Sequence, residues 1–294
     1  MISLFWSFFI IQFFGLSADH NHGAIALSNE VIATENCNLA IQIPQDDCAQ
    51  GLEFALPING INNTSLGDNV ELSEARLIIS HTWELDLRIS LRSPSGTVVP
   101  LSFENGSSAS NTSYGDISVP NCEAHTSFTM DPCLDLLTLE DPSIANNFVG
   151  KFLPEGDFAD FDGEDPNGIW FLEVCDKDSG ANTGRLEYAE LIFTEIHCEE
   201  PQNVRISSVN TASVTVEWDP IPNTDLTIVE VLPHGVAPST GMTSLNGNAF
   251  QTNSTSSSTA LQLLEDTSYD VYVRTRCPNG EFSKNSCLIF VQTE

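Results

Sequence analysis

The chain has 294 residues, with 41 acidic side chains against 10 basic ones and a formal net charge of −31. A surface this acidic repels the phosphates of nucleic acids and anionic lipids, which argues against both as partners. Hydrophobic residues make up 41% of the chain, so disorder of the whole protein is excluded. At about 100–200 residues per domain, the length predicts one large domain or two smaller ones.

The N-terminal stretch is apolar. Its first 17 residues carry no charge, and small residues at Gly15, Ser17 and Ala18 could form a cleavage site. The apolar run is short for a membrane span and lies at the terminus, so we expect residues 1–18 to be a secretory signal peptide. An uncleaved anchor and a buried strand are the alternatives. Residues 19–36 show no sustained period and are expected to be a leader or linker. The predicted location is secreted or extracellular, with no membrane span after the signal is removed.

The number of cysteines, eight, indicates that the protein resides in an oxidising compartment. An even number in a secreted chain predicts disulfides, and zinc is not favoured because no tight Cys or Cys/His pair occurs. Short loops favour the pairs Cys37–Cys48, Cys122–Cys133 and Cys277–Cys287, with Cys175 and Cys198 left over. The connectivity itself stays open at this point. The eight positions expected to form disulfides are Cys37, Cys48, Cys122, Cys133, Cys175, Cys198, Cys277 and Cys287.

The pattern from Cys37 to Cys198 is that of β-strands. In the predicted strand Glu84–Arg92, the residues Leu85, Leu87, Ile89 and Leu91 alternate with polar residues, so they share one face. The Ser-Pro-Ser-Gly turn at 93–96 leads to a partner strand, Thr97–Phe103, which predicts a hairpin. Two further strands are expected at Ile169–Val174 and Leu186–Thr194.

The pattern breaks at residues 198–201 (Cys-Glu-Glu-Pro). The roughly 95 residues that follow suit one small sandwich of short strands. The strands expected there are Asn203–Val209, Ser213–Trp218, Leu226–Leu232, Thr259–Leu264, Tyr269–Cys277 and Leu288–Thr293. The fold class predicted for the chain is therefore all-β.

Two stretches of the first unit carry a family resemblance. The segments DLRISLRSPSGTVVPL (86–101) and FDGEDPNGIWFLEVCDKDSGANTGRLEYAELIF (161–193) resemble the P domain (Homo B domain) that follows the catalytic domain of kexin-like subtilisin proteases. Where that family usually has a Trp in the last strand, this chain has Ala189 beside Tyr188. The resemblance implies a jelly-roll-like β-sandwich over residues 37–198 and a role in supporting the folding and stability of a protease catalytic domain.

Residues 199–294 resemble a fibronectin type III domain. Trp218, in the SVTVEW strand, matches the buried core tryptophan of that family. Tyr269 matches the tyrosine at the corner of the sandwich, whose hydroxyl bonds back to the chain. The stretch RCPNGEFSKNSC (276–287) resembles a disulfide-closed loop of domains appended to secreted bacterial hydrolases. The resemblance implies a smaller immunoglobulin-like sandwich and structural roles for both aromatic residues.

The sequence contains no catalytic constellation that we recognise. A serine protease needs a nucleophile, a histidine base and an orienting carboxylate. Asp178-Ser179-Gly180 matches the short motif around a subtilisin aspartate, but the histidine and serine motifs of that family are missing. The chain also lacks a G-x-S-x-G elbow and an H-E-x-x-H motif. His81 is the one histidine considered as a base, and a surface or strand-end histidine is its ordinary interpretation. No catalytic residue is therefore predicted.

Acidic loops flank the predicted strand Ile169–Val174. Acidic loops punctuated by glycine can supply the six to eight oxygen ligands that calcium needs, and bacterial P domains of similar sequence hold calcium in such loops. A solvated acidic surface is the alternative, expected at this net charge. The ends of such a strand lie ~17–20 Å apart, so the two clusters need not form one site. The candidate calcium ligands are Asp157, Asp160, Asp162, Asp165, Asp176 and Asp178.

The sequence thus predicts a secreted, disulfide-stabilised, non-catalytic accessory or binding protein. Calcium is its one candidate cofactor. The alternatives are an accessory part of a subtilisin- or kexin-like serine endopeptidase, and an extracellular adhesion module. The corresponding partners are a protease catalytic domain, an extracellular protein, or a glycan.

Overall fold

The structure is a computed structural model that describes most of the chain after residue 30. The described residues are 31–33, 37, 39–45, 48, 50–105, 113–134, 136–139, 148–178, 184–221, 226–239, 249–252, 257–261 and 263–294. The predicted signal peptide, 1–18, and most of the predicted leader lie outside them. Within the described part of the chain, no helix is both long and apolar enough to span a membrane. The all-β prediction is confirmed, because the elements formed by these described residues are strands and three short 3-10 helices.

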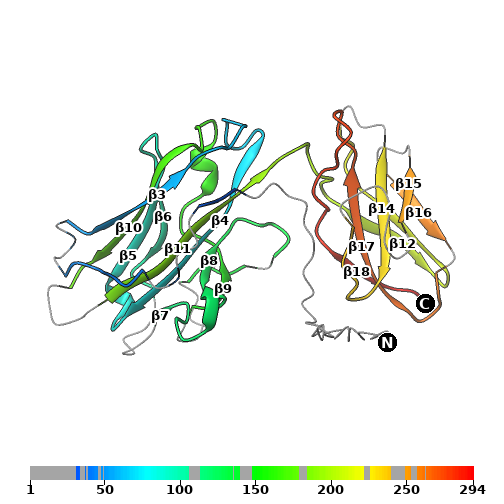
Figure 1. The fold of residues 1–294 in the computed structure, drawn as a ribbon. Coiled ribbons are helices and arrows are strands. Elements are labelled where there is room, and N and C mark those ends of the chain that lie inside the picture. The colour runs from blue at the N-terminus through cyan, green and yellow to red at the C-terminus, as the bar shows by residue number, and fades with distance from the viewer. Residues whose placement is uncertain are drawn as a thin grey trace, which may run out of the picture.

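The first unit consists of two sheets (Figure 1). One has the order β1-β11-β4-β8-β9, with β2 also pairing with β11 and β7 with β4; the other has the order β3-β10-β5-β6. Apart from the parallel pair β8–β9, the strand pairs are antiparallel. The elements are β1 (Val31–Ala33), β2 (Ile41–Gln42), β3 (Leu52–Ile58), β4 (Val70–His81), η1 (Glu84–Asp86), β5 (Leu87–Arg92), β6 (Val98–Phe103), β7 (Ser113–Tyr114), η2 (Pro120–Cys122), β8 (Thr126–Phe128), β9 (Gly150–Phe152), η3 (Phe158–Phe161), β10 (Gly168–Asp176) and β11 (Gly184–Glu195).

The two sheets enclose one hydrophobic core. Side chains from both sheets, such as Leu77 of β4 and Leu91 of β5, belong to the same buried cluster. Trp170 of β10 is fully buried, packs edge-on against Phe161 at 4.9 Å between ring centroids, and lies 5.6 Å from Phe193 of β11. Ala189 is buried in the same cluster. Burying such large apolar side chains is the main term that stabilises the sandwich.

The predicted strands of the first unit are largely present. The expected hairpin is confirmed, since β5 pairs with β6 from Arg88–Phe103 to Arg92–Val98. Residues 84–86 form the 3-10 turn η1, so the predicted strand begins at Leu87. Within the predicted leader, residues 31–33 form β1 and pair with β11, because a strand can complete a sheet edge without a hydrophobic period of its own. The strands β3 and β4 were not predicted from the sequence.

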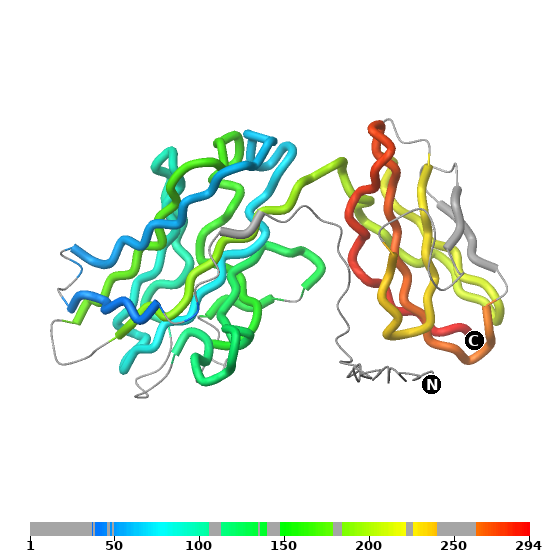
Figure 2. Tube along the Cα trace, in the orientation of Figure 1, coloured from blue at the N-terminus to red at the C-terminus, as the bar shows by residue number. Residues whose placement is uncertain are grey.

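The second unit is a smaller sandwich of two sheets, with orders β12-β13-β16 and β15-β14-β17-β18. Figure 2 shows that the chain passes into it through one segment after β11. Its strands overlap the six that were predicted and add one more. They are β12 (Arg205–Asn210), β13 (Ser213–Glu217), β14 (Thr227–Pro233), β15 (Ala249–Thr252), β16 (Ser257–Leu261), β17 (Ser268–Thr275) and β18 (Ile289–Gln292).

The two aromatic residues singled out in the second unit have the expected structural roles. Trp218 is 2% exposed and belongs to the core cluster that also holds Val229 and Val271. Tyr269 is buried, and its hydroxyl accepts a hydrogen bond from the backbone N–H of Leu264 at 2.9 Å. This bond closes the corner between β16 and β17, as predicted.

None of the three disulfide pairs that short loops favoured is present in the structure. The bridges are Cys37–Cys122, Cys48–Cys175, Cys133–Cys287 and Cys198–Cys277, with Cα–Cα distances of 5.9, 5.0, 4.6 and 5.5 Å. The prediction of four disulfides is confirmed, but the pairing is wrong. Each bridge closes at least 79 residues of sequence, because the sandwich topology brings distant segments side by side. The stretch 276–287 is therefore not closed by a bridge between its own cysteines.

Candidate functional site

A buried polar pair lies where β4 and β10 end. The Nε2 atom of His81 is 3.1 Å from Oδ2 of Asp176, and neither side chain is exposed. The N–H of Asp178 donates to Oδ1 of Asp176 at 2.9 Å. Nδ1 of His81 accepts from the N–H of Trp83 at 3.0 Å and lies 2.7 Å from its carbonyl oxygen. Buried polar groups need hydrogen-bond partners of this kind. Here the contact between His81 and Asp176 links the ends of two strands from different sheets.

This pair bears on two expectations. His81 is the last residue of β4, as a strand-end histidine would be, but it is fully buried and does not lie on the surface. Asp176, predicted as a calcium ligand, is also fully buried, with both carboxylate oxygens engaged by His81 and Asp178. Gly184, the first residue of β11, leaves room for the imidazole, since a Cβ at that position would overlap His81 Cδ2. The pair therefore has a structural role.

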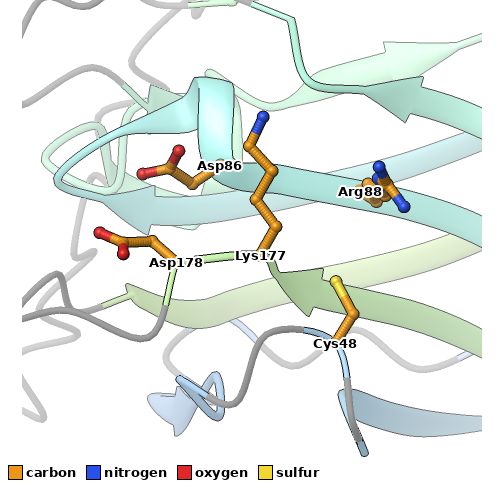
Figure 3. Close-up of a pocket in the computed structure, with 5 residues that line it drawn as sticks. All are labelled: Cys48, Asp86, Arg88, Lys177 and Asp178. Atoms are coloured by element: carbon orange, nitrogen blue, oxygen red, sulfur yellow. The ribbon is translucent and has the colours of Figure 1, made fainter.

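A shallow polar pocket of about 340 Å³ lies beside the pair (Figure 3). Its lining residues are Cys48, Asp86, Arg88, Lys177 and Asp178. The carboxylates of Asp86 and Asp178 lie on one side of the view, and Arg88 lies on the other. The Cys48–Cys175 disulfide anchors one wall of the pocket to β10.

Charge is unevenly distributed in this pocket. Burial, together with the neighbouring carboxylates of Asp178 and Asp176, raises the pKa of Asp86 above its ordinary value. The two cations are held by a carboxylate outside the pocket. Lys177 Nζ donates to Glu104 at 2.6 Å, and Arg88 Nε donates to the same carboxylate at 2.8 Å. Lys177 and His81 partly offset the effect of the neighbouring carboxylates on the pKa of Asp86.

A buried glutamate lies close by in η1. Glu84 is not exposed, and neither of its carboxylate oxygens has a hydrogen-bond partner. Burial raises its pKa to about 7. Tyr114 of β7 lies near enough that the charge on Glu84 contributes to the raised pKa of its phenol, after the larger effect of burial. Glu84 is thus a group that can change its charge near neutral pH, and no sequence motif marked it.

The other four predicted calcium ligands lie in the loop before β10. Asp157 caps η3 by accepting the N–H of Ala159 at 2.9 Å, and Asp165 accepts the N–H of Asn167 at 2.9 Å. Burial and the charges of Asp157 and Asp68 raise the pKa of Asp162. The four residues Asp157, Asp160, Asp162 and Asp165 are exposed.

The structure divides the predicted ligand set into two groups. Asp165 precedes β10 and Asp176 ends it, and a nine-residue strand is about 27 Å long. The six aspartates therefore do not form one site. Among the residues that the structure describes, no group of three or more His, Cys, Asp or Glu is arranged to hold a metal ion. Calcium binding by the loop stays a prediction.

The second unit contains a buried ion pair that sequence reasoning missed. Arg274 Nη1 donates to Glu230 Oε2 at 2.9 Å, and neither side chain is exposed. Ser239 and Asn285 complete the contacts of the guanidinium at 2.9 and 3.1 Å. One charged residue on each of two adjacent strands was the available signal. Arg274 lies opposite Ile228, so it is a diagonal neighbour of Glu230 on the same face of the sheet.

Comparison with protein families identifies the second unit. Residues 199–287 match the family described as Fibronectin type III domain. These residues form a fibronectin type III domain. The match agrees with the positions of Trp218 and Tyr269 in the sandwich. No curated protein sequence matches the chain significantly.

Solved structures similar to the chain also align with about a third of it. "Myokine structure" is 25% identical and covers 32% of this chain and 94% of its own, with a TM-score of 0.26. The FN5 domain of Drosophila Lar is 23% identical and covers 32% of this chain and 92% of its own, with a TM-score of 0.24. The fn3 domain of human contactin 1 is 19% identical and covers 33% of this chain and 78% of its own, with a TM-score of 0.28.

Proposed function

We propose that this chain is a secreted, non-catalytic protein that recognises other extracellular molecules through its two β-sandwich units. The observation that carries the proposal is the fibronectin type III domain at residues 199–287, a module typical of extracellular binding and adhesion. The four disulfides support it, because such bridges persist in oxidising compartments.

Exposed apolar side chains also support a recognition function. In the first unit, Ile169 is 51% exposed and Val98 47%. In the second, Leu288 and Phe290 beside or within the edge strand β18 are 48% and 52% exposed. Apolar groups gathered on a surface are typical of sites that contact another molecule.

The experiment uses the oxidised full-length chain, fluorescently labelled, with the cells and secreted fraction of its source. We expect saturable binding that unlabelled chain displaces, and loss of binding after reduction and alkylation of the eight cysteines. Its intact mass should lack residues 1–18 and increase by eight hydrogens on reduction, since all eight cysteines are bridged. Covalent labelling by a serine-hydrolase probe, or binding that never saturates, would overturn the proposal.

A finer form of the proposal assigns the first unit a protease-supporting role. It rests on the resemblance of residues 86–101 and 161–193 to the P domain. Those stretches contribute β5 and β10, which pair from Phe171–Arg92 to Asp176–Leu87 at the centre of one sheet. If the role is correct, adding the chain to an isolated kexin-like catalytic domain should raise that domain's melting temperature. An unchanged melting temperature would leave the broader recognition function in place.

A further inference from the structure

The four disulfides differ in how easily a thiol can reach them. All eight cysteines lie within the described residues, and Cys133 is the one that is exposed. Cys122 and Cys277, in two other bridges, are each only 3% exposed, and both cysteines of the remaining bridge are partly buried. Thiol–disulfide exchange requires a thiolate to reach a disulfide sulfur. The Cys133–Cys287 bridge is therefore the most accessible of the four.

This exposed bridge joins two units that each hold their own cysteine in place. Cys133 lies in a turn after β8, which is closed by a hydrogen bond from the N–H of Leu134 to the carbonyl of Asp131 at 3.3 Å. Cys287 precedes β18, and Ser286 beside it is bonded to β17 through its N–H, which donates, and its hydroxyl oxygen, which accepts. Opening the bridge therefore leaves both cysteines attached to folded sheets.

The noncovalent contact beside the bridge is weak. Lys284 forms an ion pair with Glu71, and their side chains are 49% and 37% exposed. Exposed ion pairs contribute little to stability, because water and salt screen them. Domains joined by a small polar contact are expected to move relative to each other. The bridge, more than the ion pair, therefore fixes the orientation of the two units.

The connecting chain contains a pivot. The N–H of Ile196 donates to the carbonyl of Asn69 in the first unit at 2.8 Å. Two residues later, Cys198 is bridged to Cys277 of the second unit. The backbone around residue 197 can therefore rotate without breaking either attachment. Once the Cys133–Cys287 bridge opens, the units can turn about this point.

Carboxylates dominate the surroundings of the bridge. Oδ1 of Asp131 accepts the N–H of Cys133 at 2.9 Å. Burial raises the pKa of Glu200; the charge of Lys284 opposes this rise, and the charges of Glu71 and Asp131 add to it. Three carboxylates therefore lie near one lysine. Such a field repels an anionic thiol and favours one that is neutral or carries a positive charge.

We propose that the Cys133–Cys287 bridge is a reducible latch, a site of thiol–disulfide exchange that takes a neutral or cationic dithiol as its reductant and holds the two units in one orientation while it is closed. A thiolate of the dithiol attacks Sγ of Cys133 and forms a mixed disulfide, and Cys287 leaves as a thiolate that takes up a proton. The second thiol of the dithiol then displaces Cys133. The dithiol loses two electrons and two protons and becomes a disulfide, and the chain gains two thiols. The latch goes beyond the recognition function, because it concerns how the units are held together.

The first test compares the rates at which the four bridges open. The oxidised full-length chain is treated with dithiothreitol, its thiols are blocked with iodoacetamide at timed intervals, and the blocked cysteines are mapped by mass spectrometry. We expect Cys133 and Cys287 to be blocked at least tenfold faster than the other six. With the monothiol 2-mercaptoethanol and an acid quench, the mixed disulfide should form on Cys133. Earlier opening of another bridge, equal rates at all four, or an adduct mainly on Cys287 would overturn the assignment.

Small-angle X-ray scattering tests whether the bridge holds the units together. A sample with only this bridge opened and its thiols blocked should have a larger maximum dimension than the oxidised chain, with unchanged near-ultraviolet circular dichroism. A sample oxidised again before blocking should return to the original dimension. The control is the double serine variant of Cys133 and Cys287, in which the same mild reduction should change nothing. If opening the bridge in the parent chain leaves the dimension unchanged, the bridge is not a latch.

Thiols of opposite charge test the class of reductant. The cation cysteamine and the anion 3-mercaptopropionate are compared, and each rate is divided by the rate of the same thiol with bis(2-hydroxyethyl) disulfide. At low salt we expect the normalised rate to be at least fivefold higher for cysteamine, and added salt should reduce the difference. Asp131→Asn, which keeps an oxygen for the N–H of Cys133, should also reduce it. The matched control, Asp266→Asn, changes an exposed carboxylate that precedes β17, at the end of this strand away from the bridge, and should have no effect. Equal normalised rates in the parent chain would rule out selection of the reductant by charge.

Discussion

Cys133 and Cys287 join the two units, with their Cα atoms 4.6 Å apart across 154 positions of sequence. Cys133 follows β8 of the first unit, and Cys287 precedes β18 of the second. Lys284 beside it forms an ion pair with Glu71 of β4. The neighbouring Ser286 accepts a hydrogen bond from the N–H of Val273 at 3.0 Å. The segment from Lys284 to Cys287 therefore contacts the first unit while remaining bound to its own sheet.

Replacing both cysteines of this bridge by serine should loosen the pair of units. We expect a lower melting temperature, with a loss of up to about 5 kcal/mol from the chain-entropy effect of so long a loop. Small-angle X-ray scattering should show a larger maximum dimension. The matched control is the double serine variant of Cys37 and Cys122, a bridge within the first unit, which should keep the maximum dimension. Identical scattering from both variants would contradict a linking role for Cys133–Cys287.

Gly184→Ala should destabilise the first unit through His81. A Cβ at position 184 overlaps the imidazole, and overpacking of this kind costs about 1–3 kcal/mol. In a His81→Ala background the ring is absent, so the same glycine substitution should cost much less. Urea denaturation of the two single variants and the double variant measures this coupling. If Gly184→Ala lowered the unfolding free energy equally in both backgrounds, the His81 ring would not be what excludes a side chain at position 184.

Glu84→Gln should change how stability depends on pH. Burial raises the folded-state pKa of Glu84 to about 7, above the ordinary value of 4.5. The folded state therefore retains its proton more strongly, and stability falls as pH rises from about 4.5 to 7. Glutamine cannot ionise, so the variant should be more stable than the parent at pH 8, by about 3 kcal/mol, and no more stable at pH 4. Denaturation at the two pH values measures the difference.

Glu74→Gln is the matched control with the opposite sign. Burial opposes ionisation of Glu74, but hydrogen bonds from Arg76, Lys151 and Ser127 outweigh it and lower the pKa to about 2. Its contribution to stability is present above pH 4.5 and is lost as pH falls toward 2, so this variant should lose stability at pH 7. The two variants should change the pH dependence of the unfolding free energy in opposite directions. A change in the same direction would contradict a raised folded-state pKa of Glu84.

The calcium hypothesis predicts a chelator-dependent melting temperature. If the loop that holds Asp157 and Asp162 binds calcium, EDTA should lower the melting temperature and added calcium should restore it. Asp162→Asn should remove most of this response, whereas Asp219→Asn, on the second unit, should keep it. A melting temperature that does not change with EDTA would leave a solvated acidic loop as the explanation.

Local pattern was sufficient to predict much of the fold. Alternation along Leu87, Ile89 and Leu91 predicted a strand with one buried face, and all three side chains are fully buried. Pro94 and Gly96 predicted the turn of the β5–β6 hairpin. These features depend on the period of a strand and the backbone preferences of neighbouring residues, which the sequence contains. Strand β4 was missed, because its sequence, VELSEARLIISH, does not alternate regularly.

The candidate site depended on contacts that are remote in sequence. His81 contacts Asp176 only because β4 and β10 end at the same corner of the sandwich. The carboxylate of Glu84 is shielded from water only because other segments cover η1. Likewise, Asp165 and Asp176 are separated because a strand holds them at its two ends.

The sequence by itself determined the all-β class, the fibronectin type III character of the second unit and the presence of disulfides. Only the tertiary structure decided which cysteines pair, which carboxylates share a site and which face of the β3-β10-β5-β6 sheet stays exposed. The physical reason is that strand period and turn preference act over a few residues. Disulfide geometry, desolvation and charge repulsion depend on distances in space, which a β-sandwich sets by pairing strands far apart in the chain.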